Sequence, residues 1–174
     1  MQEQQDEQKP PLIRVALLGT GIFGTNCSFP TIQKLSDKFK LVAVWSRRQE
    51  SVEAFVEKNI NNGGGDDDDV QGYSGEEGLD RILNNSTTDI DAVVIALPID
   101  AQPRFIELAL NAGKHVLSEK PIATNVEEAR KLWKIYKDIN HDQKQQLQWS
   151  VAENFRYEPA IGRVANAIKN NEIG

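Results

Sequence analysis

The sequence predicts a doubly wound α/β fold, in which a parallel sheet of about six strands carries helices on both faces. Three observations support this prediction. Apolar runs of strand length alternate with segments of helical period. The runs are apolar on both faces, which is typical of buried parallel strands. The first run also leads directly into a glycine-rich turn that precedes a helix.

Five apolar runs have the length of a strand. In chain order they are Ile13–Leu18, Leu41–Trp45, Asp91–Leu97, His115–Ser118 and Leu147–Ala152. A shorter and weaker run at Val70–Ser74 completes a set of six. Strands that alternate with helices imply right-handed crossover units and a parallel sheet.

Six segments between and after these runs have a helical period. They are Thr25–Lys38, Gln49–Asn59, Glu76–Leu83, Ala101–Asn111, Val126–Ile139 and Ala160–Lys169. Pro30 lies inside the first of them, where it predicts a kink or the boundary of a first turn. Gly113 is placed to end the fourth helix.

Composition excludes several classes of protein. With 174 residues, 39% of them hydrophobic and 26% charged, the chain fits one globular domain. Its net charge of -6 would repel phosphate backbones, so nucleic acid is not an expected partner. It has neither a signal peptide pattern nor an apolar stretch of membrane length, which predicts a soluble cytoplasmic protein with no membrane partner. The single cysteine, Cys27, is expected to be a small buried apolar side chain.

One segment looks like a metal site but is predicted to be a surface loop. Residues 59–70 carry four adjacent aspartates in a setting rich in glycine and asparagine. Neighbouring aspartates point in different directions and repel one another. We therefore expect no metal site.

The first motif that carries a mechanism is "GTGIFG", Gly19 to Gly24. It follows a strand and opens a helix, which is the setting of the dinucleotide fingerprint in a Rossmann fold. Gly19 suits the tight turn, Gly21 the approach of a pyrophosphate, and Gly24 the packing of helix on strand. The cofactor contacts predicted here are Gly19, Thr20, Gly21, Ile22, Phe23 and Gly24.

The end of the second strand points to NADP rather than NAD. NAD-binding proteins place an acidic residue there, but this chain has Ser46, Arg47 and Arg48. Arginine can hold a 2′-phosphate through paired donors. The alternative is that both arginines are solvated surface charges.

Ligands of open α/β sheets bind outside the carboxyl ends of the strands. Leu97, Pro98 and Gln102 follow the fourth strand, Glu119 and Lys120 follow the fifth, and Asn154 follows the sixth. We predict that all six contact the cofactor. Lys120 is also the candidate catalytic residue, unless it only pairs with Glu119 at the surface. Arg156 and Tyr157 are candidates for the substrate side.

Three stretches resemble a known family. They are "GTGIFG", "ALPIDAQPRFIELALNAGKHVLSEKPIATNVEEARKL" and "WSVAENFRYEPAI". Together they resemble the amino-terminal half of the Gfo/Idh/MocA oxidoreductases, whose signature is the Glu-Lys-Pro found at Glu119 to Pro121. The resemblance implies a pyridine-nucleotide enzyme that acts on sugars, cyclic polyols, dihydrodiols or related carbonyl compounds. It also implies that Lys120 touches nicotinamide ribose and substrate, and that Glu119 helps to place the nicotinamide.

The sequence departs from the family pattern in two ways. Leu97, Pro98, Ile99 and Gln102 stand where many members have Thr-Pro-Asn and a later His. A second domain, which in the family carries a catalytic histidine, is expected to follow the present chain. His115 and His141 do not replace that histidine, and both are expected to be exposed.

The resulting domain prediction has three parts. Residues 1–12 form a disordered tail, 13–158 form the dinucleotide-binding domain, and 159–174 form a helix that leads into a missing second domain. The expected reaction is hydride transfer between the nicotinamide and a carbon that bears oxygen, with Lys120 moving the hydroxyl proton. The longer form is expected to be a homo-oligomer. The alternative function is a non-catalytic dinucleotide-binding module or regulator.

Overall fold

A computed structural model describes residues 10–61, 70–84, 89–142 and 146–173. Most of the predicted tail and most of the acidic segment at 59–70 lie outside these residues. The strands are β1 (Ile13–Leu18), β2 (Phe39–Ser46), β3 (Gln71–Ser74), β4 (Ala92–Ile95), β5 (His115–Ser118) and β6 (Trp149–Val151).

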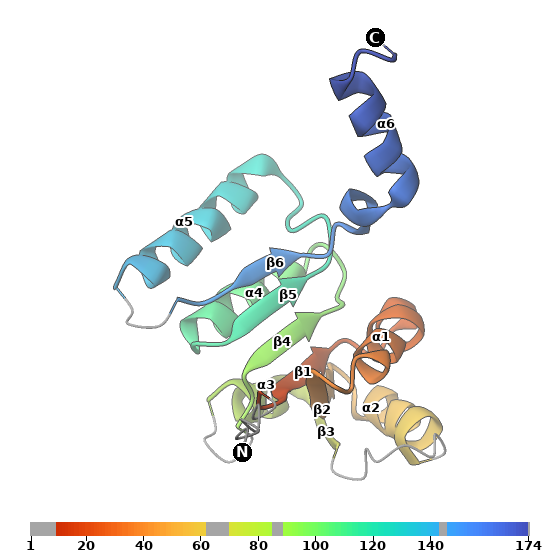
Figure 1. The fold of residues 1–174 in the computed structure, drawn as a ribbon. Helices are drawn as coiled ribbons and strands as arrows, with labels where there is room; N and C mark the ends of the chain where they lie inside the picture. The colour runs from red at the N-terminus through yellow and green to blue at the C-terminus, as the bar shows by residue number, and fades with distance from the viewer. Residues whose placement is uncertain (1–9, 62–69, 85–88, 143–145, 174) are drawn as a thin grey trace, which may run out of the picture.

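The strands form one parallel sheet in the order β3-β2-β1-β4-β5-β6 (Figure 1). This is the strand order of a Rossmann fold, so the predicted fold class is confirmed. The order reverses at β1, where Leu18 lies between Trp45 of β2 and Ile95 of β4. A crevice at the carboxyl ends of β1 and β4 is therefore the expected place for a ligand.

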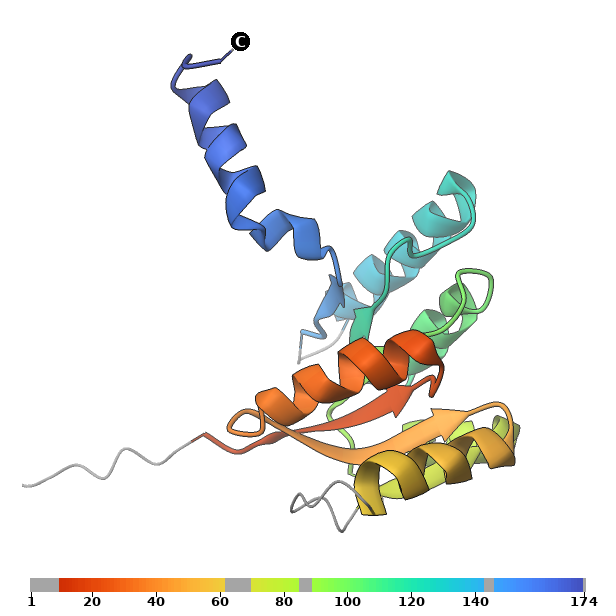
Figure 2. The ribbon, with the colours of Figure 1, turned by 90° about the vertical axis from the view of Figure 1, so that its right-hand side faces the viewer.

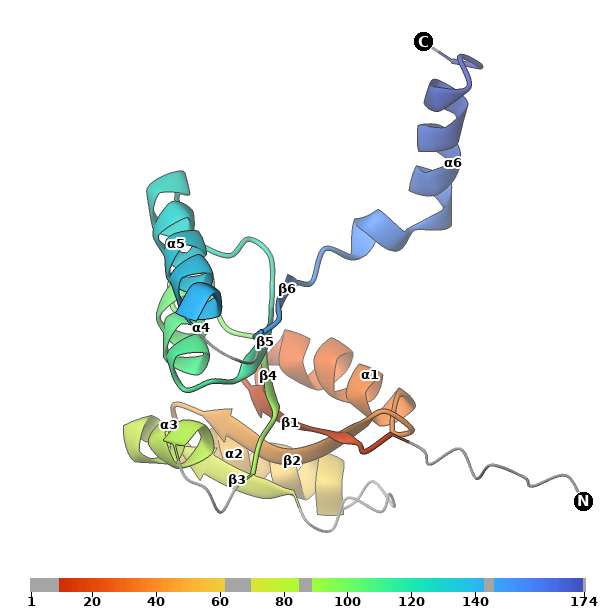
Figure 3. The same ribbon diagram turned by 60° about the vertical axis from the view of Figure 1, so that its left-hand side comes forward.

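Helices cover both faces of the sheet. The α-helices are α1 (Phe29–Lys34), α2 (Gln49–Val56), α3 (Gly75–Asn84), α4 (Gln102–Asn111), α5 (Val126–Asp142) and α6 (Pro159–Lys169). The shorter helical segments are η1 (Gly24–Ser28), η2 (Glu57–Asn61) and η3 (Asn154–Tyr157). Figure 2 shows α1 and α2 in front of the sheet, and Figure 3 shows α3, α4 and α5 on its other face.

Each face of the sheet has its own hydrophobic core. Leu17 packs with Val44, Val52 and Phe55 on the α1–α2 face, while the next residue, Leu18, belongs to the core on the face of α3, α4 and α5. Both leucines are fully buried. Burying a side chain of this size contributes about 2 kcal/mol. The central strands are thus apolar on both faces, as the sequence predicts.

The first helix differs from the simple prediction. It opens as the π-helical segment η1, in which the N–H of Phe29 donates to the Gly24 carbonyl. Pro30 then lies in the first turn of α1, where its missing N–H costs little. The irregularity expected from Pro30 is therefore a wider turn just before it. Cys27 lies in this segment and is exposed, so the prediction of a buried thiol is wrong.

The two histidines differ in their surroundings. His115 is only partly exposed, because it starts β5 and its Nδ1 accepts a hydrogen bond of 2.9 Å from the Gln148 N–H. The expectation of exposure is therefore wrong for His115. It is correct for His141, which lies near the end of α5.

A charged cluster joins β1 to β4 at the opposite edge of the sheet from the carboxyl ends. Arg14 donates to Asp91 from its backbone N–H at 2.8 Å and from its guanidinium at 3.3 Å, and it also pairs with Asp89. Burial raises the pKa of Asp91, but the hydrogen bonds and charge of Arg14 outweigh burial, and the charge of Lys114 assists. The pKa of Asp91 therefore lies below its ordinary value.

Helix α6 projects away from the sheet beyond β6 (Figure 1). Its apolar side chains Ile161, Val164 and Ile168 are 51%, 50% and 57% exposed. Their spacing puts them along one side of the helix. Among the described residues, no helix is long and apolar enough to cross a membrane.

Candidate functional site

The glycine turn after β1 is built by close contacts on two sides and open space on a third. A Cβ at Gly19 would collide with the Ala96 carbonyl, and Gly19 also has a φ of +118°. A Cβ at Gly24 would collide with the Gly19 carbonyl. A Cβ at Gly21, by contrast, would meet nothing within 4 Å. The turn is therefore closed against the protein and open where a ligand would approach.

Hydrogen bonds fix this turn to its neighbours. The Gly19 N–H donates to the Trp45 carbonyl at 2.9 Å, which joins the turn to the end of β2. The Thr20 hydroxyl donates to the Ser51 carbonyl at 3.3 Å, which joins it to α2. The helical stretch that contains η1 and α1 starts just after Gly21. Backbone N–H groups at such a start favour an anionic group.

A cleft of about 400 Å³ lies at the carboxyl ends of β1, β4 and β5. It is lined by Gly21, Ile22, Phe23, Ala96, Leu97, Pro98, Ile99, Gln102, Glu119 and Lys120. Eight of these are predicted site residues, and they come from three separate segments of the chain. Ala96 and Ile99 complete the lining and were not among the predicted contacts. The position of both residues in the segment that follows β4 was the signal that could have identified them.

Glu119 and Lys120 follow β5 and face this cleft. Lys120 is exposed, and its backbone N–H donates to the Glu119 carboxylate at 3.3 Å. Burial raises the pKa of Glu119 above its ordinary value, and the negative charge of Glu153 adds to the rise. The backbone N–H and the charge of Lys120 act in the opposite direction. Glu153, which follows β6, was missed because only the fold brings it near Glu119.

Gln102 lies deeper in the site than its neighbours. Its side chain is 1% exposed, and its Nε2 donates to the Pro121 carbonyl at 3.0 Å. Its Oε1 has no hydrogen-bond partner. The carboxamide therefore faces the turn after β5.

The remaining predicted residues lie outside the cleft. Ser46 ends β2 beside Ser74 of β3, and Arg48 occupies the N-cap position of α2. Arg47 and Arg48 are exposed, and neither has an ion-pair partner within the described part of the chain. The Gly19–Trp45 hydrogen bond puts this segment beside the glycine turn. Asn154 starts η3 after β6 and is exposed.

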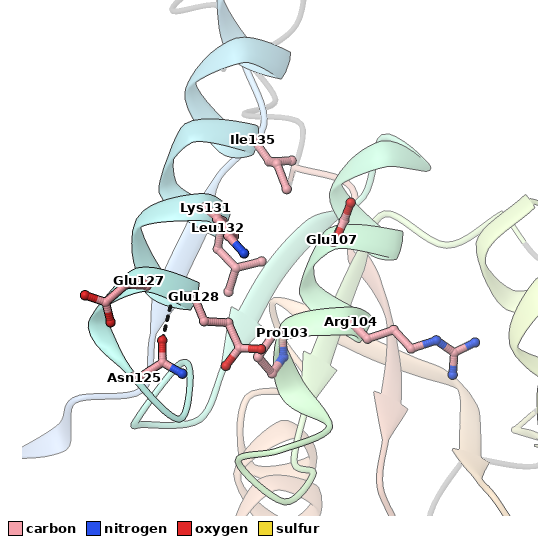
Figure 4. Close-up of a pocket in the computed structure, with 9 residues that line it drawn as sticks. All are labelled: Pro103, Arg104, Glu107, Asn125, Glu127, Glu128, Lys131, Leu132 and Ile135. Atoms are coloured by element: carbon pink, nitrogen blue, oxygen red, sulfur yellow. Dashed lines mark hydrogen bonds between the residues drawn. The ribbon is translucent and has the colours of Figure 1, made fainter.

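A larger groove of about 670 Å³ lies elsewhere, between α4 and α5 (Figure 4). It is lined by Pro103, Arg104, Glu107, Asn125, Glu127, Glu128, Lys131, Leu132 and Ile135. Glu128 serves the start of α5, where its carboxylate accepts from Thr124 and its N–H donates to Asn125. Arg104 extends away from the groove and pairs with Glu76. The residues that line the groove lie on α4 and α5 or just before α5, and not in the segments that directly follow the strands, so the smaller cleft is the better candidate site. Within the described ranges, no cluster of His, Cys, Asp and Glu is arranged to hold a metal ion.

The residues of the smaller cleft fit a dinucleotide. The open space at Gly21 leaves room for a pyrophosphate beside the backbone. Comparison with known proteins agrees with this geometry. Residues 13–144 match the model of the oxidoreductase family with an NAD-binding Rossmann fold, GFO_IDH_MocA. The chain belongs to the Gfo/Idh/MocA oxidoreductase family.

Relatives of this Gfo/Idh/MocA domain include fungal proteins. An oxidoreductase of Schizosaccharomyces pombe is 32% identical over 162 residues, which are 93% of this chain and 39% of the relative. Dehydrogenase FPY6 of Fusarium mangiferae is 37% identical over 168 residues, 94% of this chain and 44% of the relative. The chain thus spans about two fifths of the length of these relatives.

Solved structures of oxidoreductases also resemble this chain. An oxidoreductase from Thermotoga maritima is 30% identical with a TM-score of 0.77, and the match covers 94% of this chain and 45% of that one. The 3-ketoreductase KijD10 from Actinomadura kijaniata, solved with TDP-benzene and NADP, is 27% identical with a TM-score of 0.71. That match covers 94% of this chain and 45% of KijD10.

Proposed function

We propose that this protein is the cofactor-binding part of a cytoplasmic NADP-dependent oxidoreductase. The proposed substrate is a sugar, polyol, dihydrodiol or related alcohol or carbonyl compound. One observation carries the proposal: a single cleft joins the open glycine turn at Gly21 to the exposed amine of Lys120. The turn suits the phosphates of a dinucleotide, and the amine suits proton transfer at a hydroxyl.

In this proposal the residues around the glycine turn hold the phosphates and the adenosine. The turn from Gly19 to Gly24 holds the pyrophosphate, and Ser46, Arg47 and Arg48 hold the 2′-phosphate. Because Arg47 and Arg48 have no ion-pair partner within the described residues, they are available to an anion. NADP in the KijD10 structure supports this choice, while scyllo-inositol dehydrogenase from Lactobacillus casei, which shares the fold at 23% identity, holds NAD(H).

The second set of contacts lies on the nicotinamide side. Leu97, Pro98, Gln102, Glu119 and Asn154 follow β4, β5 and β6, and we assign them to this part of the cofactor. When bound, NADP supplies the carbon that accepts or donates the hydride. The Lys120 amine takes the proton of the substrate hydroxyl, or returns it in the reverse direction. Glu119 accepts the Lys120 N–H and so helps to hold the lysine backbone at the cleft.

The names of two relatives support the substrate class. A dTDP-3,4-didehydro-2,6-dideoxy-alpha-D-glucose 3-reductase of Actinomadura kijaniata is 29% identical over 166 residues. An inositol 2-dehydrogenase of Rhizobium meliloti is 37% identical over 89 residues. Both names describe redox chemistry at a ring carbon that bears oxygen. We assign the choice among such substrates, and oligomerisation, to the part of these relatives that the present chain does not cover.

Calorimetric titration of the chain with NADP and with NAD tests the proposal. We expect saturable binding of both, with NADP tighter by about tenfold or more, because a charge-assisted contact contributes roughly 1.5 to 3 kcal/mol. A spectrophotometric screen of a longer form against sugars, inositols and dihydrodiols then tests turnover. A chain that binds neither NADP nor NAD would contradict the proposal. Binding without turnover in the longer form would favour a non-catalytic module.

A further inference from the structure

The polar side chains that the described part of the fold buries completely meet at one turn. They are Gln102, which is 1% exposed, and Ser118, which is 0% exposed. Ser118 directly precedes Glu119, and the Gln102 side chain contacts Pro121. Burial of a polar group is costly unless it makes hydrogen bonds. Both buried polar side chains therefore lie where hydrogen bonds can offset their burial, at the turn from Glu119 to Pro121.

Ser118 holds the turn from the side of β6. It is the last residue of β5, and its hydroxyl accepts the indole N–H of Trp149 at 3.0 Å. Its carbonyl accepts the N–H of Ala152 at 2.8 Å. The chain that enters the turn is therefore fixed to β6 by a side-chain bond and to the residue after β6 by a backbone bond.

Gln102 holds the turn from the opposite side. It is the first residue of α4, and its Nε2 donates to the Pro121 carbonyl at 3.0 Å. Because a carbonyl can only accept, the amide nitrogen must face Pro121 and the oxygen must face away. That oxygen is buried without a partner. An apolar side chain of the same size would fill this space without leaving such an oxygen, so within the protein itself the N–H given to Pro121 is what the glutamine adds.

We propose that Gln102 is a positioning residue for Lys120. Its single hydrogen bond ties the Glu119–Pro121 turn to the start of α4 and so fixes the lysine backbone relative to the glycine turn across the cleft. Glu119 adds a second restraint, because its N–H donates to the Ile95 carbonyl at 3.2 Å. The importance of this geometry for catalysis rests on the proposed function of Lys120.

The test is hydrogen exchange in the Gln102→Met variant, followed residue by residue by NMR. Methionine has nearly the same volume and makes no hydrogen bond to Pro121. We expect the amides of Glu119, Lys120 and Thr124 to exchange roughly two- to tenfold faster, since one hydrogen bond that restrains the turn is lost. The amides of Val116 and Ala152, which are bonded within the sheet, should keep their rates. The thermal midpoint should stay close to that of the wild type, because the unpaired oxygen is removed together with the bond.

Two further variants test whether the Gln102–Pro121 hydrogen bond restrains the turn, or whether the Gln102 side chain acts only by packing. Glu107→Met changes an exposed residue on the same helix and should leave the turn amides unchanged. Gln102→Glu should loosen the turn at neutral pH, where a carboxylate faces the Pro121 carbonyl. At acid pH the protonated carboxyl can donate to that carbonyl, so the exchange ratio to the wild type should return towards one. A residue that only fills space would not produce this pH dependence.

Two results would overturn the inference. One is a Gln102→Met protein whose turn amides exchange at the wild-type rate. The other is acceleration of all amides alike with a large fall in thermal midpoint, which would make Gln102 an ordinary core residue. The proposed function is tested separately, by NADP binding to the wild-type chain. A wild-type chain that does not bind NADP would contradict the proposed function, but it would not change the hydrogen-exchange rates measured for the Gln102 variants.

Discussion

Arg47 is the residue on which cofactor choice depends most directly in our proposal. It follows β2, is exposed, and has no ion-pair partner among the described residues. Arg47→Ala should weaken NADP binding by about tenfold or more and leave NAD binding nearly unchanged, since the lost contact is to the 2′-phosphate alone. Calorimetric titration with both nucleotides measures this, and Arg130→Ala, an exposed arginine on α5, is the control. An equal loss for NADP and NAD would refute the assignment.

Lys120 is the residue on which turnover depends in our proposal. Lys120→Met keeps most of the side-chain volume and removes the amine. In a longer form with the substrate domain, we expect nucleotide affinity within a few fold of the wild type and turnover lower by roughly two to four orders of magnitude. Steady-state kinetics measures the second effect, and Lys137→Met on α5 is the control. Near-normal turnover would return Lys120 to the role of a surface charge.

Glu119 makes stability depend on pH in a defined direction. Its pKa is raised in the folded chain, chiefly by burial, so its ionised form is less favourable there than in the unfolded chain. The stability it contributes is complete below its unfolded pKa of about 4.3 and is lost as pH rises through the folded value. Glu119→Gln should therefore unfold at a higher temperature than the wild type at pH 7, and the difference should vanish near pH 4. Thermal unfolding across this range gives the answer, and a gap that grows towards acid pH would contradict it.

At the scale of the elements, Arg14 and Asp91 join the start of β1 to the segment that leads into β4. The Asp91 pKa is lowered, so its contribution is present above its unfolded value of about 3.9 and is lost as pH falls through the folded value. Asp91→Asn should cost about 1 kcal/mol at pH 7, because the pair is partly exposed and screened. Denaturant titration at several pH values measures this cost, which should shrink below pH 4. A cost that is constant with pH would show that the carboxylate charge is not involved.

The sequence predicts elements better than it predicts their ends. Runs such as Ile13–Leu18 are apolar on both faces and leave little choice but a buried strand, so all six strands and six α-helices were expected. The π-helical turn before Pro30 was not expected from the sequence, because such a turn depends on how the chain enters the helix. Edge strand β6 is shorter than its apolar run, since it pairs on one side only within the described sheet.

The candidate site was predictable where backbone geometry dictates residue type. Gly19 and Gly24 have no room for a side chain, so the motif alone indicated the turn. The burial of Gln102 was not predictable, because its partner Pro121 lies on another element of the fold. The same is true of Glu153, whose effect on Glu119 depends on the pairing of β5 with β6.

At the scale of the whole molecule, the present chain should bind the cofactor alone, because the residues assigned to phosphate, adenosine and nicotinamide all lie within it. Saturating NADP, at about a hundred times its dissociation constant, should stabilise the fold by about 2.7 kcal/mol and raise the thermal midpoint by roughly 5 to 10 °C. Differential scanning fluorimetry with NADP, and with inorganic phosphate as the control, measures the shift. Turnover by the isolated chain would show that the substrate site is contained in it.

The strand order also has a consequence for synthesis on the ribosome. The first three strands assemble as β3-β2-β1, so one side of β1 has no neighbour until β4 has been made. That side belongs to a central strand that includes the fully buried Leu17 and Leu18. An unpaired apolar edge is a template for aggregation. The nascent chain is therefore most vulnerable while residues 70–91 emerge, and this is the interval in which a chaperone would protect it most.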